Sequence, residues 1–359
     1  MKILRALAVA SLSCLLLAST PPKTDAPDPE ALMRSGHFKK ARPLVEERFR
    51  KSPLDAYSLF LMARIKSAFG SKEEAIAMLE QAVSKDPNKA QYHGVLADLY
   101  GQKARKAGFF EKVGLARKIK QHLSAAVALD PRNWDMLDGM LTFYLEAPGI
   151  MGGDKKKAQE MADQAVKDDP ANGWLMQAHI ARQNKDTSRL EEFYRKAADA
   201  APNDFETEIQ LAAYYGGGQV KKYDLAEKYA REAMRISPDR NGSYAVLAIV
   251  YVMQERWADV DKLLAAAEKA NPEDLAPMYA AARTLVTAGK DLPRAEAYFR
   301  RYLQQQPEAN TPPHAGAHWR LSQIYQKQGK RNEAISELQT ALSLDPNFEA
   351  AKKDLNALK

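Results

Sequence analysis

Prolines recur at nearly regular intervals along this chain of 359 residues. The successive intervals are 34, 44, 39, 32, 36, 34, 35 and 39 residues. A period near 34 is typical of helix-turn-helix repeats. One such unit cannot bury its apolar face alone, so the units must stack into a solenoid. The prolines that end the segments are Pro53, Pro87, Pro131, Pro170, Pro202, Pro238, Pro272, Pro307 and Pro346.

Within one interval, the apolar and small residues form two helical faces on either side of a turn. In the unit before Pro346 they recur every three or four positions, which places each set on one face of a helix. Small residues at Ser322 and Ala334 allow the two helices to approach closely. The first helix carries Leu321, Ser322 and Tyr325, Gly329 marks the turn, and the second helix carries Ala334, Leu338 and Ala341.

These residues resemble the signature of the tetratricopeptide repeat (TPR) family in order and separation. Two other units carry the same pattern. They depart from it at Lys66, where the family has an aromatic residue, and at Glu255 and Val260, which replace Gly and Ala. The matching residues are Leu59, Met62, Ala63, Gly70, Ala75, Leu79, Ala82 and Pro87 in one unit, and Tyr244, Leu247, Ala248, Tyr251, Leu264, Ala267 and Pro272 in the other.

The resemblance implies an all-α fold, a right-handed α-solenoid of about eight to nine TPR helix-turn-helix units over residues 28–347. Asp28 followed by Pro29 is a typical helix start. The first unit is abbreviated because little chain is left for its first helix. Residues 348–359 continue as a helix with Leu355 inward and charges outward. We expect this segment to be a C-terminal capping helix, which solenoids need for solubility.

The first 20 residues have the pattern of a secretory signal peptide. A short basic segment precedes an apolar run over residues 6–18. This run is short for a membrane span and has the length of a signal h-region. Small residues then lead into a Pro-rich linker at 21–27. We therefore expect export to a bacterial-type periplasm or cell envelope, with a retained membrane anchor as the alternative.

Cys14 is the only cysteine and raises the question of a lipoprotein. A lipobox needs Leu three positions before the cysteine and a small residue just before it. Ser13 supplies the small residue, but Ser11 stands where the Leu belongs. Ordinary cleavage is therefore favoured over lipidation. The mature chain would then have no cysteine, which suits an oxidising compartment.

Composition and charge fit a soluble folded protein and do not indicate a nucleic-acid partner. The net charge is +7, but the 53 basic residues are spread among 46 acidic ones. No G-x-S-x-G, H-E-x-x-H or P-loop spacing occurs, so we expect no enzyme activity and no cofactor. His314 and His318 have a spacing that can chelate a metal, but a third ligand is not evident in the sequence. We therefore predict no metal site.

The first long interval contains an inserted segment at residues 101–120. Seven basic residues and one acidic residue surround Phe109 and Phe110. One interpretation is a basic, aromatic-tipped excursion that touches an acidic partner or anionic headgroups. The other is a pair of longer helices with the phenylalanines packed inward, and we favour this second interpretation.

Two further intervals are also long. Residues 146–155 form a shaped loop within one unit, because its proline and glycines adopt backbone conformations that other residues resist. The interval before Pro346 holds the long turn that leads into the last unit. An enzyme using the loop at 148–154 remains a less favoured alternative. The loop residues singled out are Pro148, Gly149, Gly152, Gly153 and Asp154, with Asp154 expected to cap the following helix.

In TPR proteins, the first helix of each unit lines a concave groove. The resemblance therefore implies two sets of partner-binding residues. For Trp319 and Tyr279, packing against the next unit is an equal alternative. The places of the two-carboxylate clamp known in some TPR domains do not fit, since Phe60, Arg64, Gly94 and Asp98 stand there. The N-terminal set is Tyr57, Phe60, Arg64 and Asp98, and the C-terminal set is Ile249, Val252, Met253, Tyr279, Arg283, Trp319 and Gln323.

The function predicted from the sequence is a non-catalytic scaffold of the bacterial cell envelope. It would bind a protein or peptide partner on the concave face of the solenoid. The alternative is a membrane-anchored assembly factor, and peripheral membrane contact is a further expectation. The sequence identifies neither the partner nor the oligomeric state.

Overall fold

The computed structural model describes residues 27–218, 220–309 and 311–358. The described residues form nineteen α-helices and one short 3₁₀ helix, without a β-strand. The expected all-α solenoid is confirmed. The predicted signal peptide and most of the linker lie outside the described residues.

Nine helix pairs follow one another along the chain, which agrees with the expected eight to nine units. The second helix of each pair packs against its first. The first helices are α1 (Pro29–Arg34), α3 (Ala56–Ala68), α5 (Ala90–Ala104), α7 (Trp134–Glu146), α9 (Pro170–Gln183), α11 (Phe205–Gly216), α13 (Asn241–Met253), α15 (Ala276–Ala288) and α17 (His314–Lys327). The second helices are α2 (Phe38–Lys51), α4 (Lys72–Lys85), α6 (Phe109–Leu129), α8 (Lys155–Asp168), α10 (Leu190–Ala200), α12 (Tyr223–Ile236), α14 (Trp257–Ala270), α16 (Leu292–Tyr302) and α18 (Arg331–Leu344).

Most turns inside the units have a positive φ at one residue. Gly70 and Gly329 supply it with φ of 116° and 74°, which costs glycine no steric strain. Glu255 occupies the equivalent place after α13 and adopts φ of 57°. A residue with a Cβ is disfavoured in this conformation. The positive φ explains why the family usually has glycine at this place, and this chain has Glu255 there instead.

The core of each unit forms where small residues let two helices touch. Ala63 of α3 and Ala75 of α4 are fully buried, as are Ala248 and Ala334 in later units. Larger apolar side chains fill the space between units. These contacts form five apolar clusters among the described residues, and the largest of them runs through consecutive units from Leu175 to Ala334.

Both ends of the solenoid are as the sequence predicts. Helix α1 has only six residues. Helix α19 (Glu349–Ala357) follows the last pair and buries Ala351 and Leu355 against α18. The capping helix is therefore present.

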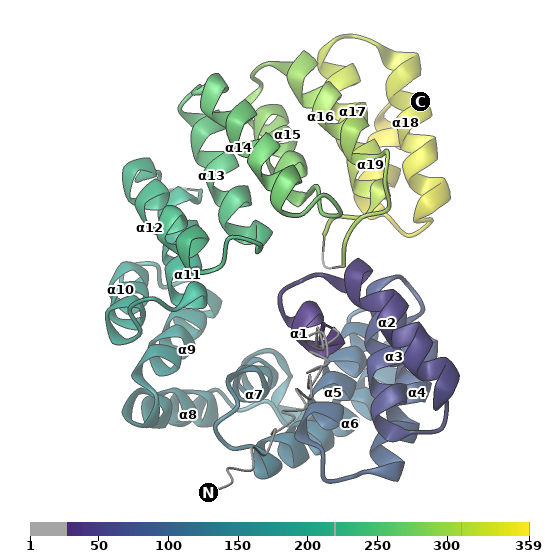
Figure 1. Ribbon diagram of the computed structural model, residues 1–359, viewed down its shortest axis with the longest axis vertical. Coiled ribbons are helices and arrows are strands. Elements are labelled where there is room, and N and C mark those ends of the chain that lie inside the picture. Colours follow the sequence, from purple (N-terminus) through teal and green to yellow (C-terminus); the bar gives the residue numbers. More distant parts are fainter. Residues whose placement is uncertain (1–26, 219, 310, 359) are drawn as a thin grey trace, which may run out of the picture.

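The solenoid curves until its first unit meets the turn before α17, so the helices form a ring (Figure 1). Ala309, in this turn, packs into the apolar cluster of the N-terminal units. Glu308 is 3% exposed and accepts hydrogen bonds from the backbone N–H of Lys39. The Lys39 ammonium donates to the carbonyl oxygen of Glu273 at 2.7 Å. We call these contacts, together with those of His37, the seam.

His37 completes the seam from the start of α2. Its Nδ1 accepts from the amide of Asn271 at 3.1 Å, so its Nε2 carries the proton and donates to Asp239 at 3.0 Å. The side chains of His37 and Asn271 are 4% and 2% exposed. Since buried polar groups are costly without partners, these bonds tie the two distant segments together.

Candidate functional site

A large hollow lies on the concave face of the N-terminal half. It has a volume of about 960 Å³ and is lined by α1, α3, α5, α6, α7 and the loop after α7. We call it the groove. Phe60, Arg64 and Asp98 of the predicted N-terminal set line it, as do Phe109, Pro148 and Met151 from the two inserted segments. The structure thus joins one predicted surface with both insertions.

The floor of the groove is apolar. Phe60 is 1% exposed and stacks at a tilt on Tyr92, with their ring centroids 4.8 Å apart. Met136 and Phe143 of α7 and Leu123 of α6 are also buried and line the hollow. Phe60 therefore supports the floor and offers little of its own surface to a partner. Met136 is the kind of flexible side chain that adapts to different ligands.

Arg64 lines the groove, with its guanidinium over the rings of Phe60 and Phe38. Burial lowers the pKa of Arg64. In the described part of the chain, no carboxylate lies within ion-pair distance of it. A desolvated guanidinium in this position can recognise an acidic group. Tyr57, from the same predicted set, instead donates its hydroxyl to Glu30 and packs under Arg48.

Three aspartates line the groove. Asp98 of α5 is exposed and accepts from the Gln102 amide at 2.9 Å. Asp135 and Asp138 of α7 also line the hollow. Asp138 accepts from Nδ1 of His179 at 2.9 Å. These carboxylates favour a cationic group of a partner beside the apolar floor.

The prediction that Phe109 and Phe110 pack inward is wrong. Their side chains are 59% and 89% exposed. Helix α6 has 21 residues, whereas α4 and α8 have 14. All three end just before the proline that closes their unit, so the extra residues extend the N-terminal end of α6 beyond its neighbours. The phenylalanines lie on this extension and are carried clear of the core.

The loop between α7 and α8 is held by its own backbone. Asp154 caps α8, as expected, by accepting from the backbone N–H groups of Lys156 and Lys157 at 3.1 Å each. Gly152 has φ of 100°. A Cβ on Gly153 would lie 1.7 Å from the carbonyl oxygen of Ala147. These two positions therefore require glycine, whereas Gly149 lies in open space.

The C-terminal set is only partly accessible. Val252 is fully buried, because it faces the core of its unit, so its prediction as a partner contact is wrong. Tyr279 is 7% exposed and packs between Phe299 and Tyr302. Trp319 donates to Asp354 at 2.7 Å and packs on Phe348. For both aromatic residues, the packing alternative holds. Of this set, Arg283 is exposed, and Ile249, Met253, Trp319 and Gln323 are half-buried.

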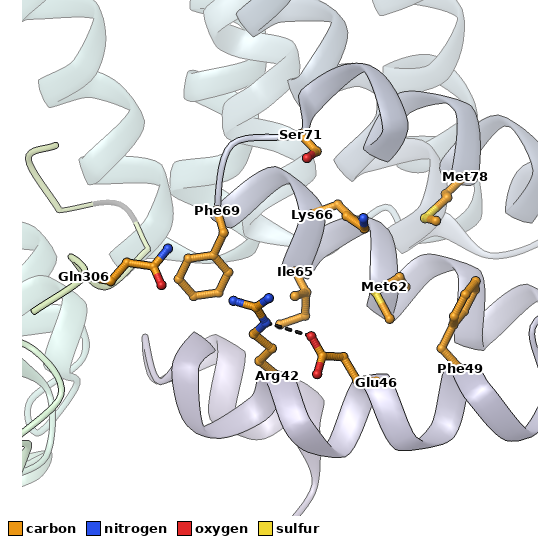
Figure 2. Close-up of a pocket in the computed structure, with 10 residues that line it drawn as sticks. All are labelled: Arg42, Glu46, Phe49, Met62, Ile65, Lys66, Phe69, Ser71, Met78 and Gln306. Carbon is orange, nitrogen blue, oxygen red and sulfur yellow. Dashed lines mark hydrogen bonds and ion pairs between the residues drawn. The ribbon is translucent and has the colours of Figure 1, made fainter. Parts of the chain in front are cut away.

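A second hollow of about 510 Å³ lies at the seam between α2, α3 and α4. Figure 2 shows Gln306, from the turn before α17, facing Phe69 and Arg42 of the N-terminal units. Arg42 donates to Glu46 at 2.7 Å and its guanidinium lies over the ring of Phe69. Sequence reasoning missed this hollow, because one lining residue, Gln306, comes from a segment far along the chain from the others, which lie within residues 42–78.

The histidines with metal-chelating spacing serve other contacts. His314 bonds through Nε2 to the carbonyl oxygen of Gln305, and His318 bonds through Nδ1 to Glu337. Across the described residues, no group of three or more His, Cys, Asp or Glu side chains is arranged to hold a metal ion. The helices that the structure describes are all too short or too polar to cross a bilayer.

Comparison with known proteins agrees with the repeat architecture. The tetratricopeptide repeat family is matched over residues 32–99, 171–204 and 315–348. The chain is a tetratricopeptide repeat protein. No curated protein sequence matches it significantly.

Solved structures with similar folds are distant in sequence. Yeast Tom70 is 17% identical with a TM-score of 0.50, over 92% of this chain and 80% of that one. A tetratricopeptide repeat protein from Parabacteroides merdae is 17% identical with a TM-score of 0.47, over 73% and 98%. PilW, a type IV pilus biogenesis factor, is 20% identical with a TM-score of 0.45, over 62% and 98%. At these identities, the likeness concerns the fold alone.

Proposed function

We propose that this protein is a non-catalytic scaffold that binds an extended segment of a protein partner in the groove. The observation that carries the proposal is the groove itself, an open hollow with an apolar floor on the concave face of a TPR solenoid. Binding sites in proteins combine such apolar walls with a few placed polar groups. The groove has both, and its walls come from four consecutive units.

The side chains of the groove define the chemistry of the bound segment. An apolar anchor of the segment would rest on the half-buried side chains of Val95, Ile119 and Met151, which line the groove. A lysine or arginine would lie over Asp98 and Asp135, where the carboxylates are concentrated. An acidic group would pair with Arg64. The positive charge of Arg64 and the negative charges of these carboxylates would also fix the direction in which the segment lies.

We further propose that the protein acts in the cell envelope. The support is the signal-like pattern of residues 1–20. The alternative, a membrane-anchored assembly factor, keeps this segment or carries a lipid on Cys14. Mass spectrometry of the mature N-terminus separates the two. A start near residues 19–23 supports export as a free protein, whereas a lipid-modified Cys14 supports the anchored form.

Photocrosslinking in cells tests the groove directly. A photoreactive amino acid replaces Asp98 in the groove, and in a control it replaces Gln81, which is exposed on the second helix α4. We expect the groove position to capture a specific partner that the control position does not. Equal capture at both positions, or capture at Gln81 alone, would refute the proposal. Adding Arg64→Ala to the groove variant should reduce the yield.

A further inference from the structure

The extended N-terminal end of α6 carries two apolar side chains that the fold leaves uncovered. Phe109 and Phe110 are 59% and 89% exposed, with ring centroids 5.6 Å apart in an edge-to-face pair. The seven residues by which α6 exceeds α4 correspond to about two helical turns. We call residues 105–115 the spur. Its tip offers aromatic surface away from the core.

The spur and its surroundings are strongly basic. Between residues 103 and 120 there are seven basic residues and one acidic residue, Glu111, which pairs with Lys103 at 3.4 Å. Lys118 pairs with Glu80. The others lack an acidic partner within ion-pair distance in the described part of the chain. These unpaired residues are Arg105, Lys106, Lys112, Arg117 and Lys120.

A third apolar side chain lies at the same edge of the solenoid. The α5–α6 and α7–α8 connections both follow first helices of neighbouring units, so they emerge on the same edge. Phe109 and Met151 line the same hollow, and Gly152 lies against Lys120 of α6. Ile150, beside Met151, is 84% exposed. Both insertions therefore present apolar tips along one basic edge.

We propose that this edge docks on an anionic phospholipid surface. Phe109 and Phe110 would enter the headgroup region, and the unpaired lysines and arginines would lie at the lipid phosphates. Aromatic and aliphatic side chains flanked by basic ones are the composition of interfacial membrane-binding segments. Charge complementarity selects the anionic surface. The contact adds a second binding surface to the scaffold, and this surface shares Phe109 with the lining of the groove.

A fluorescent label beside the phenylalanine pair tests the proposal in the full chain. Gly114 is exposed with open space around it. Gly114→Cys, in a Cys14→Ser background without other thiols, accepts an environment-sensitive dye. The label reports on the spur alone, so residues 1–26 cannot mimic the signal. Leu54→Cys, at an exposed apolar residue on another unit, is the matched control.

Vesicles containing one third phosphatidylglycerol should shift the emission maximum of the spur label to shorter wavelengths. Vesicles of pure phosphatidylcholine should leave it unchanged. Phe109→Ser/Phe110→Ser should abolish the shift. Lys106→Gln should weaken vesicle affinity about fivefold, since each cation near an anionic surface contributes about this factor. An equal shift of the label at position 54, or an unchanged shift without the phenylalanines, would overturn the proposal. A shift that grows with protein concentration without lipid would assign the edge to a second copy and also overturn it.

Discussion

The buried carboxylate of Glu308 accepts hydrogen bonds from the backbone N–H of Lys39, which lies 269 positions earlier in the chain. Lys39 is the second residue of α2, where the helix itself supplies no acceptor for the N–H. Glu308 thus caps a helix at the opposite end of the solenoid. The long turn before α17 therefore closes the ring. The extra residues of the interval before Pro346 thus make contacts that the stacking of neighbouring units does not require.

Glu308→Ala should loosen the seam. The Lys39 amide loses its acceptor, so it should exchange its hydrogen much faster with solvent. We expect the free energy of unfolding to fall by about 1–3 kcal/mol. Hydrogen exchange measured by mass spectrometry or NMR reads the amide directly. The amide of Glu73, at the same place in α4 after an N-cap that makes no side-chain bond, should exchange fast in both proteins. A Lys39 amide unprotected in the wild type would contradict the seam.

The seam should also respond to pH. Burial raises the pKa of Glu308 above its ordinary value of 4.5. The native state therefore binds a proton more readily than the unfolded state, so this group adds stability below its unfolded pKa and loses it as pH rises through the folded pKa. Relative to Glu308→Gln, which cannot titrate, the wild type should gain stability as pH falls from 7 toward 4.5. Denaturation at a series of pH values measures this, and a constant difference would refute it.

Gly153→Ala should disrupt the loop that borders the groove. The new Cβ would overlap the carbonyl oxygen of Ala147, and backbone must move to relieve the contact. We expect a loss of about 1–3 kcal/mol of stability, the range for overpacked sites. Gly149→Ala is the control, because its Cβ meets nothing within 4 Å. Thermal melts of both variants give the comparison, and equal melting temperatures would argue against this loop conformation.

Trp319→Phe should weaken the attachment of the capping helix. The phenyl ring keeps the packing on Phe348, but the hydrogen bond to Asp354 is lost. The expected cost is about 1 kcal/mol. A double-mutant cycle with Asp354→Ala isolates this bond. A coupling energy near zero would show that Trp319 is free to serve a partner, as the groove interpretation of this residue proposed.

The repeat period predicts the helices, their pairing and the capping helix, because each unit's contacts are local in sequence. The groove was predicted only through Phe60, Arg64 and Asp98. Its wall on α7, including Met136 and Asp135, was missed, since the register of that unit is obscured by the insertions on both sides of it.

The contacts of the seam and the exposure of the two phenylalanines could not be predicted from the sequence, for a different reason. The partners of Glu308 depend on the accumulated curvature of eight units, which no local pattern encodes. The orientation of Phe110 depends on how far α6 extends past its neighbours. Val252 was placed on the wrong face by a helical register error, to which a first helix apolar on all sides is prone. The long intervals between prolines indicated where these features lie in the chain, but they did not predict the geometry of the features.

The claim that a partner segment binds in the groove is tested most directly by filling the groove with a large side chain. Gly94 of α5 lies in the groove, and an added Cβ there would contact only the side chain of Met136. Gly94→Trp should occupy the floor without disturbing the core, and Glu73→Trp on α4 is the exposed control. The measurement is the Kd of the partner captured at position 98. We predict that Gly94→Trp raises this Kd at least tenfold while Glu73→Trp leaves it unchanged, and an unchanged Kd for Gly94→Trp would contradict the claim.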